Sequence, residues 1–215
     1  MHLYCLLLDE LFSRLTTMRT RLGEIAIGIR MWDDARVEYE IKMLQLRKCF
    51  ELVAVIAAEG HAQIYEQFKR ARMEESVLVE NLCRKMRAVN PEFFPNPIAR
   101  SEAGYSIDGQ QVWNIQSAFS SALHIDEAEF LAVYREILTS FSHESRTSPS
   151  EPSRRDFLRL KMICEKIIRT MMHHQITLGG HHFIAGFGRP PEIAKSSATL
   201  FGPSLTDQLR WCSKR

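Results

Sequence analysis

The sequence predicts an all-α protein, a helical bundle of about five to seven helices with a small β-hairpin near the C-terminus. Long stretches carry apolar residues at steps of three and four, and these stretches contain few Gly or Pro. One short segment changes its apolar period to two, which indicates strands. Apolar residues make up 45% and charged residues 25% of the 215 residues, as is typical of globular domains.

The first part of the chain predicts four helices. Residues 3–30 place Leu, Met and Ile at steps of three and four, which predicts an amphipathic helix with one buried stripe. Residues 35–58 contain no Gly or Pro and are nearly all apolar after Phe50, as expected of a central helix. Shorter helices are expected at 62–73 and 74–89, the second with acidic residues at its front and basic residues at its back.

The next part predicts a break, two more helices and the hairpin. Three prolines within residues 91–97 forbid a helix and impose an extended path. Helices are expected at 126–141 and 154–174, because each carries an apolar face and the first begins with acidic residues. Gly179-Gly180 supplies a two-residue turn, which predicts a hairpin over about 175–187.

The chain predicts one helical domain over residues 1–189, followed by a C-terminal tail at 190–215. No linker of disordered composition separates the helices. The Ser- and Pro-rich stretch at 145–153 is short enough to be an ordinary connection.

Composition excludes several classes of protein. A net charge of +2 is too small to indicate a nucleic-acid footprint over the whole chain. Five Cys without a CxxC pair are typical of buried thiols in a reducing compartment. The first residues, "MHLYCLLLDELFSR", lack a basic segment, and Asp9 and Glu10 interrupt their apolar run, which predicts neither a signal peptide nor a membrane span. We therefore expect a cytoplasmic protein that does not bind a membrane.

Metals and cofactors are not expected. The chain contains no GxGxxG, Walker, GxSxG or HExxH motif. Its two His pairs, 173–174 and 181–182, flank the predicted turn, which puts His174 opposite about Ala185 and the pairs roughly 10–13 Å apart. One zinc ion cannot join groups so far apart, because Zn–N distances are about 2 Å.

His143 and Arg146 are the candidate catalytic pair, in "FSHESR" at the end of a predicted helix. A metal-independent ribonuclease needs a His for proton transfer and a cation for the charge that develops on the phosphate. A helix end followed by a loop allows both side chains to point into one groove. The alternative is that His143 is a helix C-cap and Arg146 a solvated loop residue.

Two further pairs are candidates for binding or support. Arg169 and His174 have an Arg-x4-His spacing, which also arises by chance in a chain rich in Arg. The alternative for His174 is a cationic side chain favoured at a helix C-terminus. Arg47 and Glu51 lie four residues apart on the central helix, where they either form a structural ion pair, the favoured interpretation, or line a groove.

Four stretches resemble, in this order, a group of bacterial helical proteins with HEPN-like domains. They are "LQLRKCFELVAVIA", "KMRAVNPEFFPNPI", "VYREILTSFSHESR" and "RTMMHHQITLGGHHFI". The similarity covers roughly residues 35–187. It implies an all-α bundle that often dimerises and, in many HEPN proteins, a ribonuclease of toxin–antitoxin or phage-defence systems with an Arg-x4–6-His motif.

The resemblance is incomplete at the motif. His143 falls at the helix-end position where this group carries a His, and Arg146 follows it. The Arg expected upstream is absent, because positions 136–138 are Glu, Ile and Leu. This departure puts nuclease activity in doubt and leaves room for a binding or dimerisation module.

Two functions therefore remain open. The first is a bacterial interaction or regulatory module, working as a homo-oligomer or in a larger protein assembly of a phage-defence or toxin-type system. The alternative is a metal-independent HEPN-like endoribonuclease acting on RNA. In that case His143 is the acid and base, Arg146 holds the phosphate, and Arg47 and Glu51 support them across a dimer groove.

Overall fold

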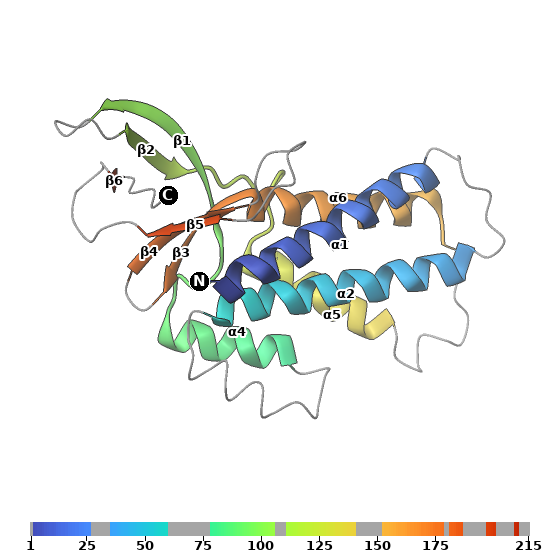
Figure 1. Cartoon of the computed structure of the whole chain (residues 1–215). Coiled ribbons are helices and arrows are strands. Elements are labelled where there is room, and N and C mark those ends of the chain that lie inside the picture. The colour runs from blue at the N-terminus through green and yellow to red at the C-terminus, as the bar shows by residue number, and fades with distance from the viewer. Residues whose placement is uncertain are drawn as a thin grey trace.

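The computed structural model shows a helical bundle with an antiparallel sheet at one end (Figure 1). It describes residues 2–26, 35–59, 78–105, 111–140, 152–178, 181–186, 197–200 and 209–210. The helix predicted at 62–73 lies outside these residues.

Five helices form the bundle in the described part of the chain. They are α1 (His2–Ala26), α2 (Ala35–Glu59), α4 (Leu78–Val89), α5 (Glu127–Ser140) and α6 (Arg154–Met172). Each agrees with a predicted helix to within a few residues at its ends. No described helix is long and apolar enough to cross a membrane.

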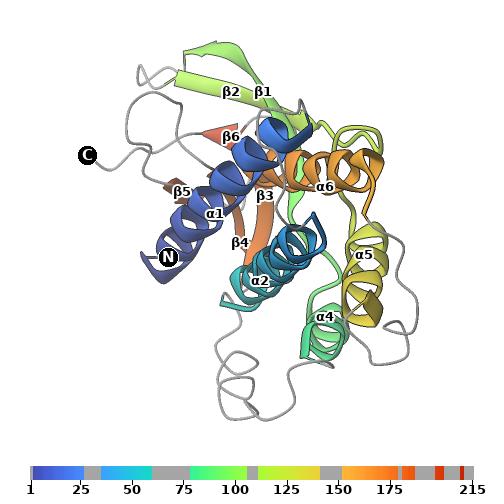
Figure 2. The same cartoon turned by 90° about the vertical axis from the view of Figure 1, so that its right-hand side faces the viewer.

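The helix α2 occupies the centre of the bundle, as predicted. It contacts α1, α4, α5 and α6, and Figure 2 shows it between α1 on one side and α4 and α5 on the other. Its Phe50 ring stacks on Phe130 of α5 with the ring centroids 4.6 Å apart. Phe94 then packs edge-on against Phe130, which ties the chain after α4 to this core.

The helix α1 runs antiparallel to α6 along most of its length. Its predicted stripe is buried from Leu11 to Ile25, whereas Leu3 and Leu6 at its start are exposed. Near the far end of the pair, the position of a Cβ at Gly23 lies 3.7 Å from Lys161. At the end nearer the sheet, Tyr4 reaches His174, directly beyond the end of α6.

Six described strands form one antiparallel sheet, in the order β5-β4-β3-β1-β2-β6. They are β1 (Asn96–Tyr105), β2 (Gln111–Ser117), β3 (His173–Leu178), β4 (His181–Gly186), β5 (Ser197–Leu200) and β6 (Leu209–Arg210). The strand β1 pairs with β3 only at Asn96 and Pro97 and with β2 from Ile98 onwards. The β1–β2 hairpin consequently curves away from the helices (Figure 1).

The all-α prediction is too narrow, although the helical bundle is confirmed as the larger part of the described chain. The hairpin predicted at about 175–187 corresponds to β3 and β4, and His174 does lie opposite Ala185. The strands β1 and β2 were not predicted, because the prolines indicated only an extended path. The strands β5 and β6 belong to the predicted tail, 190–215, two short parts of which join the sheet.

The passage from α6 to β3 is abrupt. The helix ends at Met172 and the strand begins at His173, with no residue between them. Gly186 of β4 pairs with His173 at this point. A Cβ at Gly186 would lie 2.1 Å from the Met172 carbonyl oxygen, so only a residue without a side chain fits there.

Ion pairs between helices fix α5 between α4 and α6. Four of them join a cation to a carboxylate on the neighbouring helix: Arg87–Glu127, Arg135–Glu80, Lys166–Glu129 and Arg159–Glu136. On each side of α5 the partners run in opposite chain directions, so α5 is antiparallel to both neighbours. Because these side chains are mostly exposed, each pair stabilises the fold little and mainly orients the helices.

Candidate functional site

His143 and Arg146, the predicted catalytic pair, lie outside the described residues. The structure describes the chain up to Ser140 at the end of α5 and again from Pro152, just before α6. The nuclease hypothesis for this pair therefore stays a prediction.

The start of α6 lies on the C-terminal side of this connection. Both the backbone N–H and the hydroxyl of Ser153 donate to the Asp156 carboxylate, at 2.8 and 2.7 Å. These two hydrogen bonds lower the pKa of Asp156. On α2, burial raises the pKa of the nearby Tyr39 hydroxyl, and the charges of Asp156 and Glu136 raise it further. The Ser153 and Asp156 side chains therefore stabilise the first turn of α6.

Arg47 and Glu51 form the ion pair favoured from the sequence. Arg47 Nε lies 2.9 Å from Glu51 Oε1, with exposed fractions of 18% and 17% for the two side chains. Lys48 Nζ approaches the other Glu51 oxygen at 2.8 Å. Burial raises the pKa of Tyr134 on α5, and the neighbouring Glu51 charge raises it further. The pair therefore lies where α2 meets α5, and its role in supporting a catalytic site stays a prediction.

His174 is a core residue. The side chain is fully buried, and its Nδ1–H donates to the Met171 carbonyl at 3.1 Å. Nε2 then carries a lone pair, which accepts the Tyr4 hydroxyl at 2.6 Å. Burial lowers the pKa of His174 to about 4, so the ring is neutral near pH 7. The interpretation of His174 as a cationic side chain at a helix end is wrong, because the sheet and α1 cover it.

Arg169 does not share a site with His174. Its side chain is exposed on α6, whereas His174 is in the core. The fold instead brings Arg169 near His124, in the connection between β2 and α5. Burial lowers the pKa of His124, and the Arg169 guanidinium lowers it further. The His that lies near Arg169 is therefore not the predicted one.

The connection between β2 and α5 carries this His124 in a defined conformation. The Ser120 backbone N–H donates to His124 Nδ1 at 3.0 Å, and the Phe119 ring lies 6.1 Å from the imidazole, centroid to centroid. We call the exposed side chains of this loop and the adjoining face of α6, together with His124, the Arg169 patch: Phe119, Leu123, His124, Arg169 and Met172. The patch is not evident from the sequence, because His124 and Arg169 are 45 positions apart and no motif links them.

A second exposed feature lies on α2. Val37, Ile41 and Leu44 have exposed fractions of 49%, 41% and 47%. Residues separated by four and then three positions share one face of a helix. We call these three residues the α2 stripe. The stripe could not be recognised from the sequence, because the buried faces of the same helix are also rich in apolar residues.

The described cysteines are thiols, as predicted, and most are buried. Cys49, Cys83 and Cys164 are buried and unpaired. Burial raises the pKa of Cys49 and of Cys83 to about 12, so both stay protonated at neutral pH. Buried protonated thiols fill space in the core and are poor nucleophiles.

Comparison of the chain with protein-family models, with curated proteins and with solved structures found no match.

Proposed function

We propose that the protein is a helical interaction module that binds a second copy of itself through the α2 stripe. In this proposal it acts as a regulatory component of a bacterial phage-defence or toxin-type system. The observation that carries the first part is the exposure of Val37, Ile41 and Leu44 on one helix face. The second part depends on the resemblance to HEPN-like proteins.

The physical argument begins with the surroundings of the α2 stripe. The other large apolar side chains of α2 are mostly buried, including Met43, Leu46 and Phe50. The core of the bundle is therefore formed by the other faces of α2, without the α2 stripe. Single exposed apolar residues are ordinary on a surface, whereas three on one helix face form a continuous apolar strip that a partner can cover. A polar rim is present, since Arg36 and Glu40 form an exposed ion pair beside the row.

A second copy is the partner that this geometry favours. A two-fold axis through the α2 stripe brings the same apolar residues of both copies together, so one contact buries the stripe of each copy. Helices packed in this way bury apolar rows against one another without forming new main-chain hydrogen bonds.

The test is the mass in solution of wild type and of Ile41→Lys, measured by light scattering over a range of concentrations. We expect a wild-type dimer and a monomeric, folded Ile41→Lys variant. Met162→Lys is the matched control, because Met162 is equally apolar and 50% exposed but lies on α6. A monomeric wild type, or a dimer that survives Ile41→Lys, would overturn the proposal.

A further inference from the structure

The Arg169 patch combines three kinds of group: an aromatic ring, a guanidinium and an imidazole. Phe119 is 42% exposed, Arg169 is exposed, and His124 lies near both of them. Aromatic rings stack on nucleobases, and guanidinium groups bind phosphate through paired N–H donors. Leu123 and Met172, 45% and 40% exposed, add apolar surface to the patch.

Arg169 is available for an anion. In the described part of the chain it has no carboxylate within ion-pair distance, unlike Arg87, Arg135 and Arg159. A surface arginine without a carboxylate partner keeps all five of its N–H donors for a ligand.

The acidic residues that follow the loop are already engaged. Asp126 Oδ1 accepts the Glu129 backbone N–H at 2.7 Å and so caps α5. Glu127 pairs with Arg87, and Glu129 pairs with Lys166. Glu127 and Glu129 are therefore each paired with a cation, and no carboxylate of the described residues forms an ion pair with Arg169.

His124 adds a directed donor. Because the Ser120 N–H occupies Nδ1, the neutral imidazole carries its proton on Nε2. A neutral Nε2–H group donates to a phosphate oxygen without adding a second charge beside Arg169. This tautomer is a poor proton acceptor at Nε2, so the arrangement suits binding better than acid–base chemistry.

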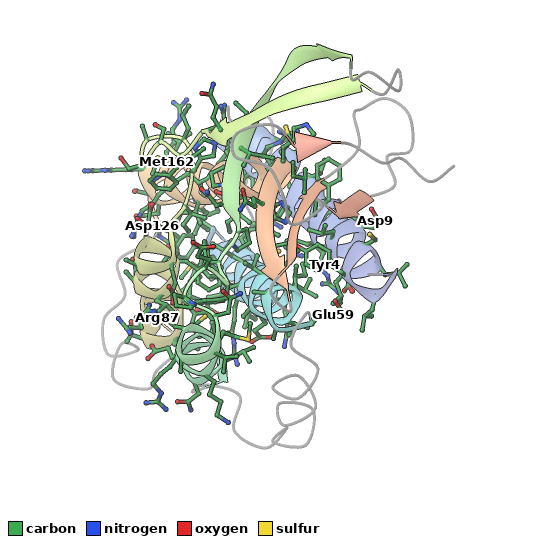
Figure 3. The ribbon with its side chains drawn as sticks, turned by 90° about the vertical axis from the view of Figure 1, so that its left-hand side faces the viewer. Tyr4, Asp9, Glu59, Arg87, Asp126 and Met162 are labelled. Carbon is green, nitrogen blue, oxygen red and sulfur yellow. The ribbon has the colours of Figure 1, made fainter. Side chains whose placement is uncertain are left out.

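The loop is held in place before any ligand arrives. At its start the Ala118 N–H donates to the Pro97 carbonyl at 2.9 Å. At its end the Ile125 N–H donates to the buried Thr170 hydroxyl, also at 2.9 Å, one residue beyond Arg169. Figure 3 shows Asp126, the next residue, on the same side of the molecule as Met162 of α6. Fixed ends reduce the entropy lost when a ligand binds.

We propose that the Arg169 patch binds a nucleotide, whose base stacks on Phe119 and whose phosphate accepts hydrogen bonds from Arg169 and His124. The nucleotide is either free or part of a single-stranded nucleic acid, since both present the same base and phosphate. The patch lies on the loop and α6, away from the α2 stripe, so this inference and the proposed function fail independently.

The test is a titration of the full-length protein at low salt with three probes: adenosine monophosphate, a single-stranded oligoadenylate RNA and inorganic phosphate. We expect the nucleotide or the oligonucleotide to bind with a Kd below about 1 mM, and inorganic phosphate to bind more weakly. Saturation by the mononucleotide identifies a free nucleotide as the ligand. Binding of the RNA alone identifies the polymer.

Variants connect the binding to the patch. Phe119→Ala and Arg169→Gln each remove one exposed group, and we expect each to weaken binding about tenfold or more. Arg155→Gln is the matched control, because Arg155 is an exposed arginine on the same helix. Absence of binding to both nucleotide probes overturns the proposal. Equal binding by wild type and Phe119→Ala, or equal loss in Arg155→Gln, overturns it as well.

Discussion

At the scale of single residues, the Tyr4–His174 hydrogen bond couples a proton to the stability of the fold. The imidazole is fully buried, and both of its nitrogens are satisfied by α1 and the end of α6. Burial raises the pKa of Tyr4 well above its ordinary value, and the nearby Cys5 and Glu59 raise it further. Tyr4 therefore stays a hydroxyl donor, and the pair depends on a neutral His174.

The first prediction concerns stability in acid. An unfolded chain protonates His174 near pH 6.5, whereas the folded protein does so only near pH 4. The unfolded state thus binds more protons between these values, so the free energy of unfolding falls as pH falls through this window. The full loss is about 3 kcal/mol.

Urea unfolding at several pH values measures this effect. The variant His174→Gln keeps an amide that can donate to Met171 and accept from Tyr4 but does not titrate. We expect a flatter pH profile for His174→Gln, while His124→Gln keeps most of the slope. An unchanged slope in His174→Gln would show that other groups cause the acid sensitivity.

The second prediction concerns Gly186. An added methyl group would overlap the Met172 carbonyl oxygen, which is backbone and cannot rotate away. We expect Gly186→Ala to lower the free energy of unfolding by about 1–3 kcal/mol.

Gly23→Ala is the matched control for Gly186→Ala. Its methyl group would meet only Lys161 at 3.7 Å, and Ala favours the helix, so we expect a gain of about 0.5–1 kcal/mol. Denaturant unfolding of both variants measures these changes in the free energy of unfolding. An unchanged free energy of unfolding in Gly186→Ala would mean that β4 shifts easily.

Single residues were predictable from the sequence where their partners are local. Arg47 and Glu51 are one helical turn apart, and they form the expected ion pair. The partner of His174 is 170 residues away, so its position at a helix end suggested an exposed cation instead. Arg169 was a candidate, but its neighbour His124 depends on how the β2–α5 loop meets α6.

At the scale of elements, the start of α6 is fixed by its own sequence. Ser153 and Asp156 are three residues apart, the spacing of a capping box, and they are hydrogen-bonded. The third prediction is that Asp156→Ala, which removes the acceptor of both bonds, destabilises the protein by about 0.5–2 kcal/mol.

Thermal unfolding followed by circular dichroism measures the effect of Asp156→Ala. The control is Ser121→Ala, a change at an exposed polar side chain outside any helix. Equal melting temperatures for Asp156→Ala and wild type would show that the cap contributes nothing.

Elements with local signals were predicted well, and those with distant partners were not. The hairpin of β3 and β4 has its own turn and alternation. The strand β1 contains Pro97 and Gly104 and a register shift after Glu102, so it shows no clean alternation. The strand β6 has two residues and exists only because β2 lies beside it. Such strands follow from the assembled sheet rather than from their own residues.

At the scale of the whole molecule, the two functions considered from the sequence differ in whether the protein cleaves RNA. An interaction module does not need acid–base chemistry, whereas a HEPN-like ribonuclease requires His143. The fourth prediction follows from the proposed function: purified wild type does not cleave labelled RNA when metals are chelated. The nuclease hypothesis predicts cleavage that falls by about 10²–10⁴ in His143→Ala.

The control for this assay is Ser145→Ala, which changes the same connection without removing a titratable group. Cleavage that survives in Ser145→Ala and disappears in His143→Ala would make the pair catalytic and would contradict our expectation. The same samples should be checked for their mass in solution, because HEPN-like activity implies a dimer groove.

The packing of α1 on α6 also constrains how the protein is made. A ribosome adds roughly 5–20 residues per second, and the residues joined by the Tyr4–His174 hydrogen bond are 170 positions apart. Roughly ten to thirty seconds of translation therefore separate the synthesis of α1 from that of α6, one of the two helices that cover its apolar stripe. During this delay part of the apolar surface of α1 is exposed on the nascent chain, which favours binding by a ribosome-associated chaperone. Premature termination before α6 would leave α1 covered by α2 alone, with part of its apolar stripe exposed, and would favour proteolysis of the fragment.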